Sequence, residues 1–325
     1  NPRDATAYFN RAITYRQQGH IERAIADYDH AIALDPEDAA AYYNRGNARR
    51  QQGEIEEAIA DYAQAIALNP DYARAYYNRG LAYADQGDMD RALADFDQAL
   101  SLNPQDAAFY VGRGNVFSER GDLEKAMENY ALALAVDPQD AEAYNNRGVF
   151  YADQDELEQA ITDYSQAMAL NPQFAEAYNN RGIAYFRLDK LELAIDDFTQ
   201  ALELSPRFAD AYNNRGIAYA EQGAPKEAIA DYTQAIALNA SSSVAFYNRG
   251  LVRAERGELE EAIADYTQAI ALDPHDPTAY NNRGIAHFQR GELAQAIANF
   301  GQALALDSQF AEAHYNRGTA YIEKG

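Results

Sequence analysis

The sequence predicts an all-α solenoid built from antiparallel helix pairs that repeat every 34 residues. Arginine recurs with this period ten times, from Arg11 to Arg317, and proline recurs at seven consecutive repeats, from Pro2 to Pro206. A fixed period of this length indicates a small unit that cannot bury its apolar face alone and therefore stacks on copies of itself. Because stacked units share one continuous core, the length of 325 residues does not by itself predict separate globular domains.

Each unit begins with one helical segment. With Ala5 taken as position one, Tyr8, Ala12 and Tyr15 follow at i, i+4 and i+7, which places them on one face of a helix over residues 7–18. Gly19 then predicts a left-handed residue that ends this helix.

A second helical segment completes the unit. Its apolar face is formed by Ile21, Ala24, Ile25, Tyr28, Ala31 and Ile32. Pro36 ends it, because the residue before a proline is pushed out of the α region. We expect the small residue at position eight of the first helix to face the alanine at position twenty of the second, with aromatic side chains beside them.

These positions together form a known pattern. An aromatic residue at position four, Gly or Ala at eight, Tyr at eleven, Ala at twenty, Tyr or Phe at twenty-four, Ala at twenty-seven and Pro at thirty-two resemble the tetratricopeptide repeat (TPR) family. The resemblance covers essentially the whole chain and implies a right-handed superhelix. The chain departs from the family at position seven, which is Arg rather than the usual Leu, and at position eleven in Arg49, Arg253 and His287.

The repeat divides the chain into segments of equal length. The nine full repeats are 5–38, 39–72, 73–106, 107–140, 141–174, 175–208, 209–242, 243–276 and 277–310. Residues 1–4 match the tail of a preceding repeat, and residues 311–325 match the first helix of a tenth. Since both ends interrupt the pattern, we expect the chain to be a fragment of a longer array or of a multidomain protein.

Composition excludes several classes of partner. The net charge of −24, from 27 Lys and Arg against 51 Asp and Glu, argues against nucleic acid or an anionic membrane, because both need a basic surface. No apolar run approaches the roughly 18 residues of a membrane span, and no signal peptide is visible, so we expect a soluble protein. The absence of cysteine excludes disulfides and is consistent with the cytoplasm, which is the expected location, although it also allows export.

Asparagine forms a regular column at position six of the first helix, on the side opposite the apolar face. A column of carboxamides offers a donor and an acceptor at each step, which suits the backbone of an extended peptide. The column resembles the asparagine ladder of a glycosyltransferase repeat domain, which lines the concave groove of the superhelix. The alternative is that these asparagines hydrogen-bond neighbouring helices and specify stacking. The candidate peptide-binding asparagines are Asn44, Asn78, Asn146, Asn180, Asn214, Asn248, Asn282 and Asn316.

Acidic residues flank the asparagine column. The candidate groove acids are Glu142, Glu176 and Asp210 at position two, and Asp153, Glu221 and Glu255 at position thirteen. They favour a ligand that carries Lys or Arg. Aliphatic residues at position nine, with Phe186 and Phe288 at position twelve, either hold a partner's side chains or pack neighbouring helices together.

Arginine at position seven and the acid at position twenty-three predict a repeated Arg–Asp contact within or between repeats, with anion binding as the alternative. Position five contains no Lys, so we do not expect binding of chaperone tails through the family's carboxylate clamp. The five histidines lack metal-ligand spacing, and no glycine-rich phosphate loop or separate acid–base pair stands out. We therefore expect no enzyme activity, no cofactor and no metal.

Three functions remain open. The first is a non-catalytic protein-interaction scaffold that binds an extended, basic peptide in its concave groove. The second is a self-assembling structural array whose cut ends associate. The third is the substrate-recruiting arm of a larger enzyme, such as a glycosyltransferase.

Overall fold

The computed structural model describes residues 4–325, and all regular secondary structure in this range is helical. The predicted all-α solenoid of paired helices is confirmed. The chain divides into two compact units: unit 1 extends to Glu156, and unit 2 begins at Leu157. None of the helices in the described range is long and apolar enough to cross a membrane.

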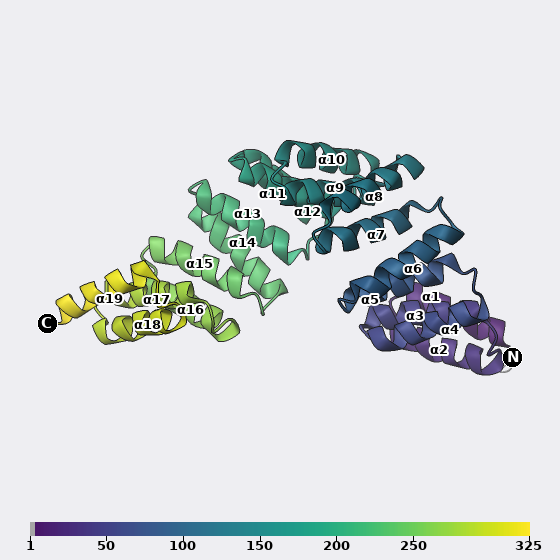
Figure 1. Ribbon diagram of the computed structural model, residues 1–325. Helices are drawn as coiled ribbons and strands as arrows, with labels where there is room; N and C mark the ends of the chain where they lie inside the picture. The colour runs from purple at the N-terminus through teal and green to yellow at the C-terminus, as the bar shows by residue number, and fades with distance from the viewer. Residues whose placement is uncertain (1–3) are drawn as a thin grey trace. The chain divides into compact units, whose positions relative to one another are not determined.

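Unit 1 is a series of helix pairs in which helices that follow one another in sequence pack together (Figure 1). Its helices are α1 (Ala5–Gln17), α2 (Ile21–Leu34), α3 (Ala39–Gln52), α4 (Ile55–Leu68), α5 (Ala73–Asp85), α6 (Met89–Leu102), α7 (Ala107–Glu119), α8 (Leu123–Val136) and α9 (Ala141–Asp153).

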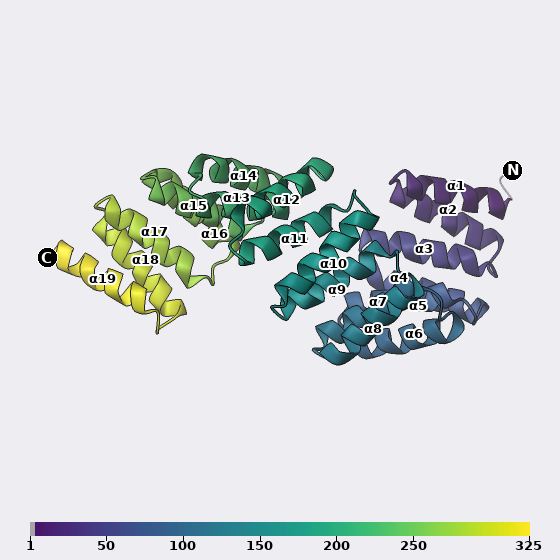
Figure 2. The ribbon, with the colours of Figure 1, turned by 90° about the horizontal axis from the view of Figure 1, so that it is seen from above.

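Unit 2 has the same architecture, which Figure 2 shows clearly for α17 and α18. Its helices are α10 (Leu157–Leu170), α11 (Ala175–Arg187), α12 (Leu191–Leu204), α13 (Ala209–Glu221), α14 (Pro225–Leu238), α15 (Ser243–Glu255), α16 (Leu259–Leu272), α17 (Pro277–Gln289), α18 (Leu293–Leu306) and α19 (Ala311–Lys324). The division between the units falls between α9 and α10, which belong to one expected repeat, 141–174.

The first helix of a pair ends at a residue with positive φ. Gly19 has φ of 78°, which confirms the predicted left-handed terminator, and glycine occupies the equivalent site in most repeats. Asp155 and Asp189 occupy it in the other two, with φ of 63° and 57°. These aspartates adopt a conformation that glycine reaches without steric cost.

Close helix contact depends on position eight, which meets the aromatic ring at position twenty-four as well as position twenty. A Cβ added to Gly216 would lie 2.8 Å from Cε1 of Tyr232, at position twenty-four. The ring therefore lies against the glycine, and at Gly80 such a Cβ would also lie 3.2 Å from the carbonyl oxygen of Ala92, the alanine expected at position twenty. Tyr232 is almost fully buried in this arrangement.

The arginine at position seven links three helices. Arg215 on α13 donates from Nε to Asp231 Oδ2 at 2.7 Å and from Nη2 to Asp231 Oδ1 at 2.8 Å. Its Nη1 donates to Thr199 Oγ1 of the preceding repeat at 3.0 Å. The hydrogen bonds to Asp231 raise the pKa of Arg215 although its burial lowers it. The predicted Arg–Asp contact is confirmed, and it is repeated by Arg11, Arg45, Arg79, Arg181 and Arg249.

Candidate functional site

The candidate site is the stripe at positions two, six, nine and thirteen of the first helices, which we call the asparagine face. These positions are separated by four, three and four residues, so they form one row along each helix. In unit 2 the face lies on α11, α13, α15, α17 and α19, the first helices of its repeats. The two units are described separately below.

In unit 2 the asparagine column is a chain of hydrogen bonds between repeats. Four asparagines of the column donate from Nδ2 to the position-five side chain of the preceding repeat: Asn214 to Asn179 Oδ1 at 3.0 Å, Asn248 to Asn213 Oδ1 at 3.3 Å, Asn282 to Tyr247 Oη at 2.8 Å, and Asn316 to Asn281 Oδ1 at 3.1 Å. The bonds expected if the column specifies stacking are therefore present. Asn180, at the start of the column, accepts a weak bond from Asn179 Nδ2 at 3.5 Å.

These bonds use only part of each carboxamide. An asparagine has two N–H donors and an acceptor oxygen. Across residues 4–325, the Oδ1 atoms of Asn214, Asn248, Asn282 and Asn316 accept no hydrogen bond from the protein, and these side chains are half-buried. The bond to the preceding repeat fixes the amide, which leaves the oxygen and the second N–H available to a ligand.

The column is less regular in unit 1. Asn78 donates to Tyr43 Oη at 2.9 Å and to Asn47 Oδ1 at 2.8 Å, so both of its N–H groups are used. Asn44 donates to the carbonyl of Ala40 on its own helix, and Asn146 is half-buried. The sequence gives no reason for Gly112 in this column, but a Cβ there would lie 2.8 Å from the Tyr77 ring.

The six predicted groove acids are all exposed. Glu142 and Asp153 lie at the two ends of α9 in unit 1, whereas Glu176, Asp210, Glu221 and Glu255 lie on α11, α13 and α15 in unit 2. None of the six forms an ion pair with another residue in the described range. Their charges are therefore available to a partner.

The apolar residues beside the column are partly buried and pack against the core, except Val149 at position nine, which is 37% exposed. Ile183 and Phe186 pack against a cluster that contains Phe198, and Ile285 and Phe288 pack against one that contains Phe300. Packing between helices, the second of the two roles considered for these residues, is thus the one observed.

Two asparagines at position nine have a role that sequence reasoning missed. Asn47 Oδ1 accepts from Tyr62 Oη at 2.9 Å, and Asn115 Oδ1 accepts from Tyr130 Oη at 2.8 Å. The signal was present, because Asn at position nine coincides with Tyr at position twenty-four in both repeats. No group of three or more His, Cys, Asp or Glu side chains suited to a metal occurs within residues 4–325.

Comparisons with known proteins agree with this architecture. A TPR repeat model matches residues 13–49, 46–87, 114–155, 150–189, 250–290 and 286–325, and a tetratricopeptide repeat model matches 73–106, 175–208 and 209–242. A search of curated proteins gives no match.

Solved structures with the same fold include three with low sequence identity. YrrB, described as a TPR protein with an unusual peptide-binding site, has 24% identity and a TM-score of 0.51, and the match covers 58% of this chain and 97% of YrrB. The Cut9–Hcn1 structure has 14% identity and a TM-score of 0.64, over 97% of this chain and 76% of the matched one. Pseudomonas aeruginosa pilF has 22% identity and a TM-score of 0.57, over 62% and 92%.

Proposed function

The chain belongs to the tetratricopeptide repeat family, whose members generally serve as non-catalytic scaffolds for protein–protein interaction, and on that premise we propose that its asparagine face binds an extended, basic peptide. The observation that carries this proposal is the hydrogen bonding of the asparagine column in unit 2. Four amides there, those of Asn214, Asn248, Asn282 and Asn316, are held by the preceding repeat while their Oδ1 atoms stay open. An extended peptide presents backbone N–H groups that such oxygens accept, whatever its side chains.

Fixed amides favour binding for an energetic reason. A side chain that is already ordered loses little further conformational freedom when a ligand arrives, so less of the interaction energy is offset by entropy. The bonds that stabilise stacking therefore also prepare the ladder for a peptide, and the two readings of the column are compatible.

The exposed acids favour a positively charged ligand. Glu221 and Glu255 are exposed at the ends of α13 and α15, and Glu176 and Asp210 are exposed near the starts of α11 and α13. Because these carboxylates pair with no cation among residues 4–325, a Lys or Arg of the ligand would meet no competitor there. Exposed charges mainly raise the rate at which a ligand associates and fix the register in which it binds, and salt weakens their attraction for it.

Binding of two labelled peptides tests the proposal. One alternates Lys with Ser and the other alternates Glu with Ser, and fluorescence anisotropy is measured at low and high salt. We expect the Lys peptide to bind more tightly to the chain, with an affinity that falls as salt rises. Equal binding of the two peptides without salt dependence would refute the basic preference.

Two double variants separate charge from the ladder. Glu221→Gln with Glu255→Gln should weaken binding of the Lys peptide, whereas Glu227→Gln with Glu260→Gln removes equal charge from exposed sites on α14 and α16 and should not. Asn180→Ala with Asn214→Ala should weaken binding at both salt concentrations. If that variant binds like the parent, the ladder is not the site.

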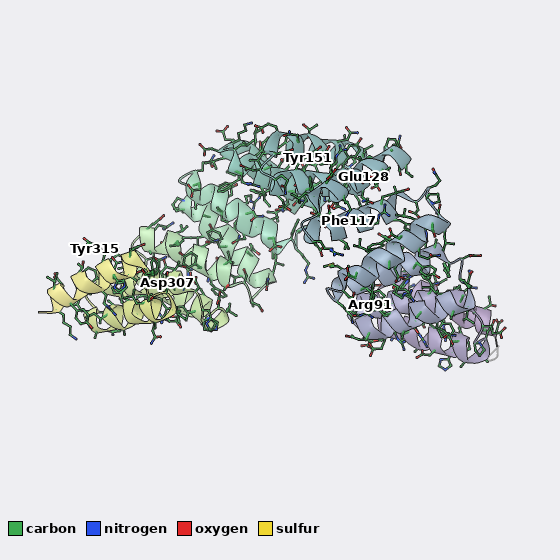
Figure 3. All side chains as sticks on the ribbon, in the orientation of Figure 1. Arg91, Phe117, Glu128, Tyr151, Asp307 and Tyr315 are labelled. Atoms are coloured by element: carbon green, nitrogen blue, oxygen red, sulfur yellow. The ribbon has the colours of Figure 1, made fainter. Side chains whose placement is uncertain are left out.

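Self-assembly has one observation in its favour. Tyr315, which Figure 3 labels on α19, is 75% exposed, and Ile322 on the same helix is 84% exposed. We propose as a second candidate that this apolar surface associates with another copy. Light scattering over a range of concentrations should then show a rising mass that Ile322→Lys suppresses, and a constant monomer mass would exclude this candidate.

A further inference from the structure

A hollow in unit 1 has the opposite charge to the asparagine face of unit 2, on which Glu176, Asp210, Glu221 and Glu255 are exposed. Its volume is about 510 Å³, within the usual range for ligand sites. We call it the arginine hollow, and the lining residues that matter are Arg16, Asn47, Arg50, Tyr62, Asn78 and Asp85. They come from α1, α3, α4 and α5.

The repeat pattern changes at this place. Positions twelve and thirteen are Arg16–Gln17 and Arg50–Gln51 in the first two repeats. In the third they are Ala84–Asp85, and most later repeats also pair a residue without a charge with an acid. Two cations therefore replace small side chains, and two neutral amides replace carboxylates, on the same side of neighbouring helices.

The two arginines are not neutralised equally. Arg50 Nε donates to Asp85 Oδ2 at 2.8 Å. Within residues 4–325 the guanidinium of Arg16 forms no hydrogen bond or ion pair, although the residue is partly buried. Both arginines act on Tyr62, where they oppose the rise in the pKa of the phenol that burial causes. The hollow thus contains two positive charges and one negative charge.

Hydrogen bonds also orient a neutral donor in the hollow. Asn47 Oδ1 accepts from both Tyr62 Oη at 2.9 Å and Asn78 Nδ2 at 2.8 Å. The oxygen is thereby occupied, and the Nδ2 group of Asn47 donates to no residue in the described range. A fixed amide donor beside two guanidinium groups suits an acceptor with several lone pairs, and a carboxylate is such an acceptor.

We propose that the arginine hollow binds a carboxylate carried by an acidic peptide segment. A guanidinium holds a carboxylate through two parallel hydrogen bonds, and Arg16 has its full set of donors available. The volume exceeds that of a carboxylate alone, which leaves room for the side chain and the adjoining backbone. A basic side chain would instead be repelled here.

The test uses two labelled hexapeptides, Ser-Gly-Glu-Glu-Gly-Ser and its counterpart with Gln in place of Glu. Binding to the whole chain is measured by fluorescence anisotropy at low salt, and circular dichroism checks that each variant folds. The Glu peptide should bind roughly tenfold more tightly than the Gln peptide, since hydrogen bonds to charged groups are the stronger ones. Equal affinities would overturn the proposal.

Variants with opposite expected effects make the test specific. Arg16→Gln should remove most of the preference for Glu, whereas Arg23→Gln, which removes the same charge from an exposed site on α2, should retain it. Asp85→Asn should strengthen binding of the Glu peptide, because it removes the carboxylate that occupies Arg50. Equal effects of Arg16→Gln and Arg23→Gln, or weaker binding by Asp85→Asn, would overturn the assignment.

A competition arm distinguishes a peptide from a small free acid. Unlabelled succinate should displace the Glu peptide only at concentrations well above those at which unlabelled peptide does so, and equal potency would overturn the assignment to a peptide. This test is independent of the basic-peptide proposal, because the acids of α11, α13 and α15 contribute nothing to the hollow.

Discussion

Arg283 is a natural test of the arginine contacts, because its partner at position twenty-three is Asn299 rather than Asp. Arg283 Nε donates to Asn299 Oδ1 at 2.7 Å, and Nη1 donates to Thr267 Oγ1 at 3.1 Å. No carboxylate lies within ion-pair distance in the described range, and burial lowers the pKa of Arg283. By contrast, bonding to Asp231 raises the pKa of Arg215. We predict that Asn299→Asp stabilises unit 2.

The size of the effect follows from the bonds that change. The substitution adds a second bond to the guanidinium, and a hydrogen bond to a charged group contributes about 1.5–3 kcal/mol. It loses the bond from Asn299 Nδ2 to the Gln295 carbonyl, at 2.8 Å, which contributes about 0.5–1.5 kcal/mol. The new carboxylate loses hydration, but the arginine is already partly desolvated in the parent. We therefore expect a net gain of about 1 kcal/mol.

Thermal and urea denaturation followed by circular dichroism measure this change at neutral pH. A gain of about 1 kcal/mol should raise the midpoint of a unit of this size by roughly 2–4 °C. Gln302→Glu is the matched control, since it adds the same charge to an exposed site on α18. A midpoint for Asn299→Asp at or below that of the control would show that desolvation exceeds the pairing energy, and the reasoning would fail.

Three further predictions concern stability. Asp189→Gly should raise the free energy of unfolding in urea by about 0.5–1 kcal/mol, because a left-handed residue costs about 1–2 kcal/mol and the entropy of glycine offsets part of that gain; an unchanged midpoint would contradict this. Gly216→Ala should cost about 1–3 kcal/mol in thermal melts, since its Cβ would overlap the Tyr232 ring. Burial raises the pKa of Tyr77 to about 12, so folding favours the protonated phenol. The contribution of this phenol to the free energy of unfolding is therefore complete below about pH 10 and is lost as pH rises to about 12. Tyr77→Phe should consequently lose less stability than the parent between those pH values, and equal losses would refute it.

The fold was predictable because each recurring residue has a local cause. Gly19 ends a helix and Ala24 permits close approach, and neither depends on distant parts of the chain. The contact of position eight was predicted less well. Spacing placed Ala92 opposite Gly80, but it gives the face of a residue and not the path of a ring, so the sequence could not show that the Tyr232 ring lies on Gly216.

The candidate site was only partly predictable for the same reason. Periodicity placed Asn214 and Glu221 on one face of α13, but it could not show which atoms of the amide are used. That Asn214 donates to Asn179 and keeps its oxygen open is a matter of rotamer and neighbour. The division between α9 and α10 was also not predicted, because repeat 141–174 keeps the helical pattern and its Asp155, in place of the terminating glycine, has a counterpart in Asp189 within unit 2.

The functional information lies in positions that the solenoid does not constrain. Core positions such as those of Gly216 and Tyr232 must keep their size, because the helices pack through them. Position thirteen is exposed in unit 2 at Glu221 and Glu255, and position twelve varies from Arg16 and Arg50 in unit 1 to the core-packed Phe186 in unit 2. A net charge of −24 averages over this difference and predicts only basic partners. The charged residues of the two units differ, whereas the packing of their helices is the same. One scaffold can therefore carry both the arginine hollow in unit 1 and exposed acids beside the asparagine column in unit 2.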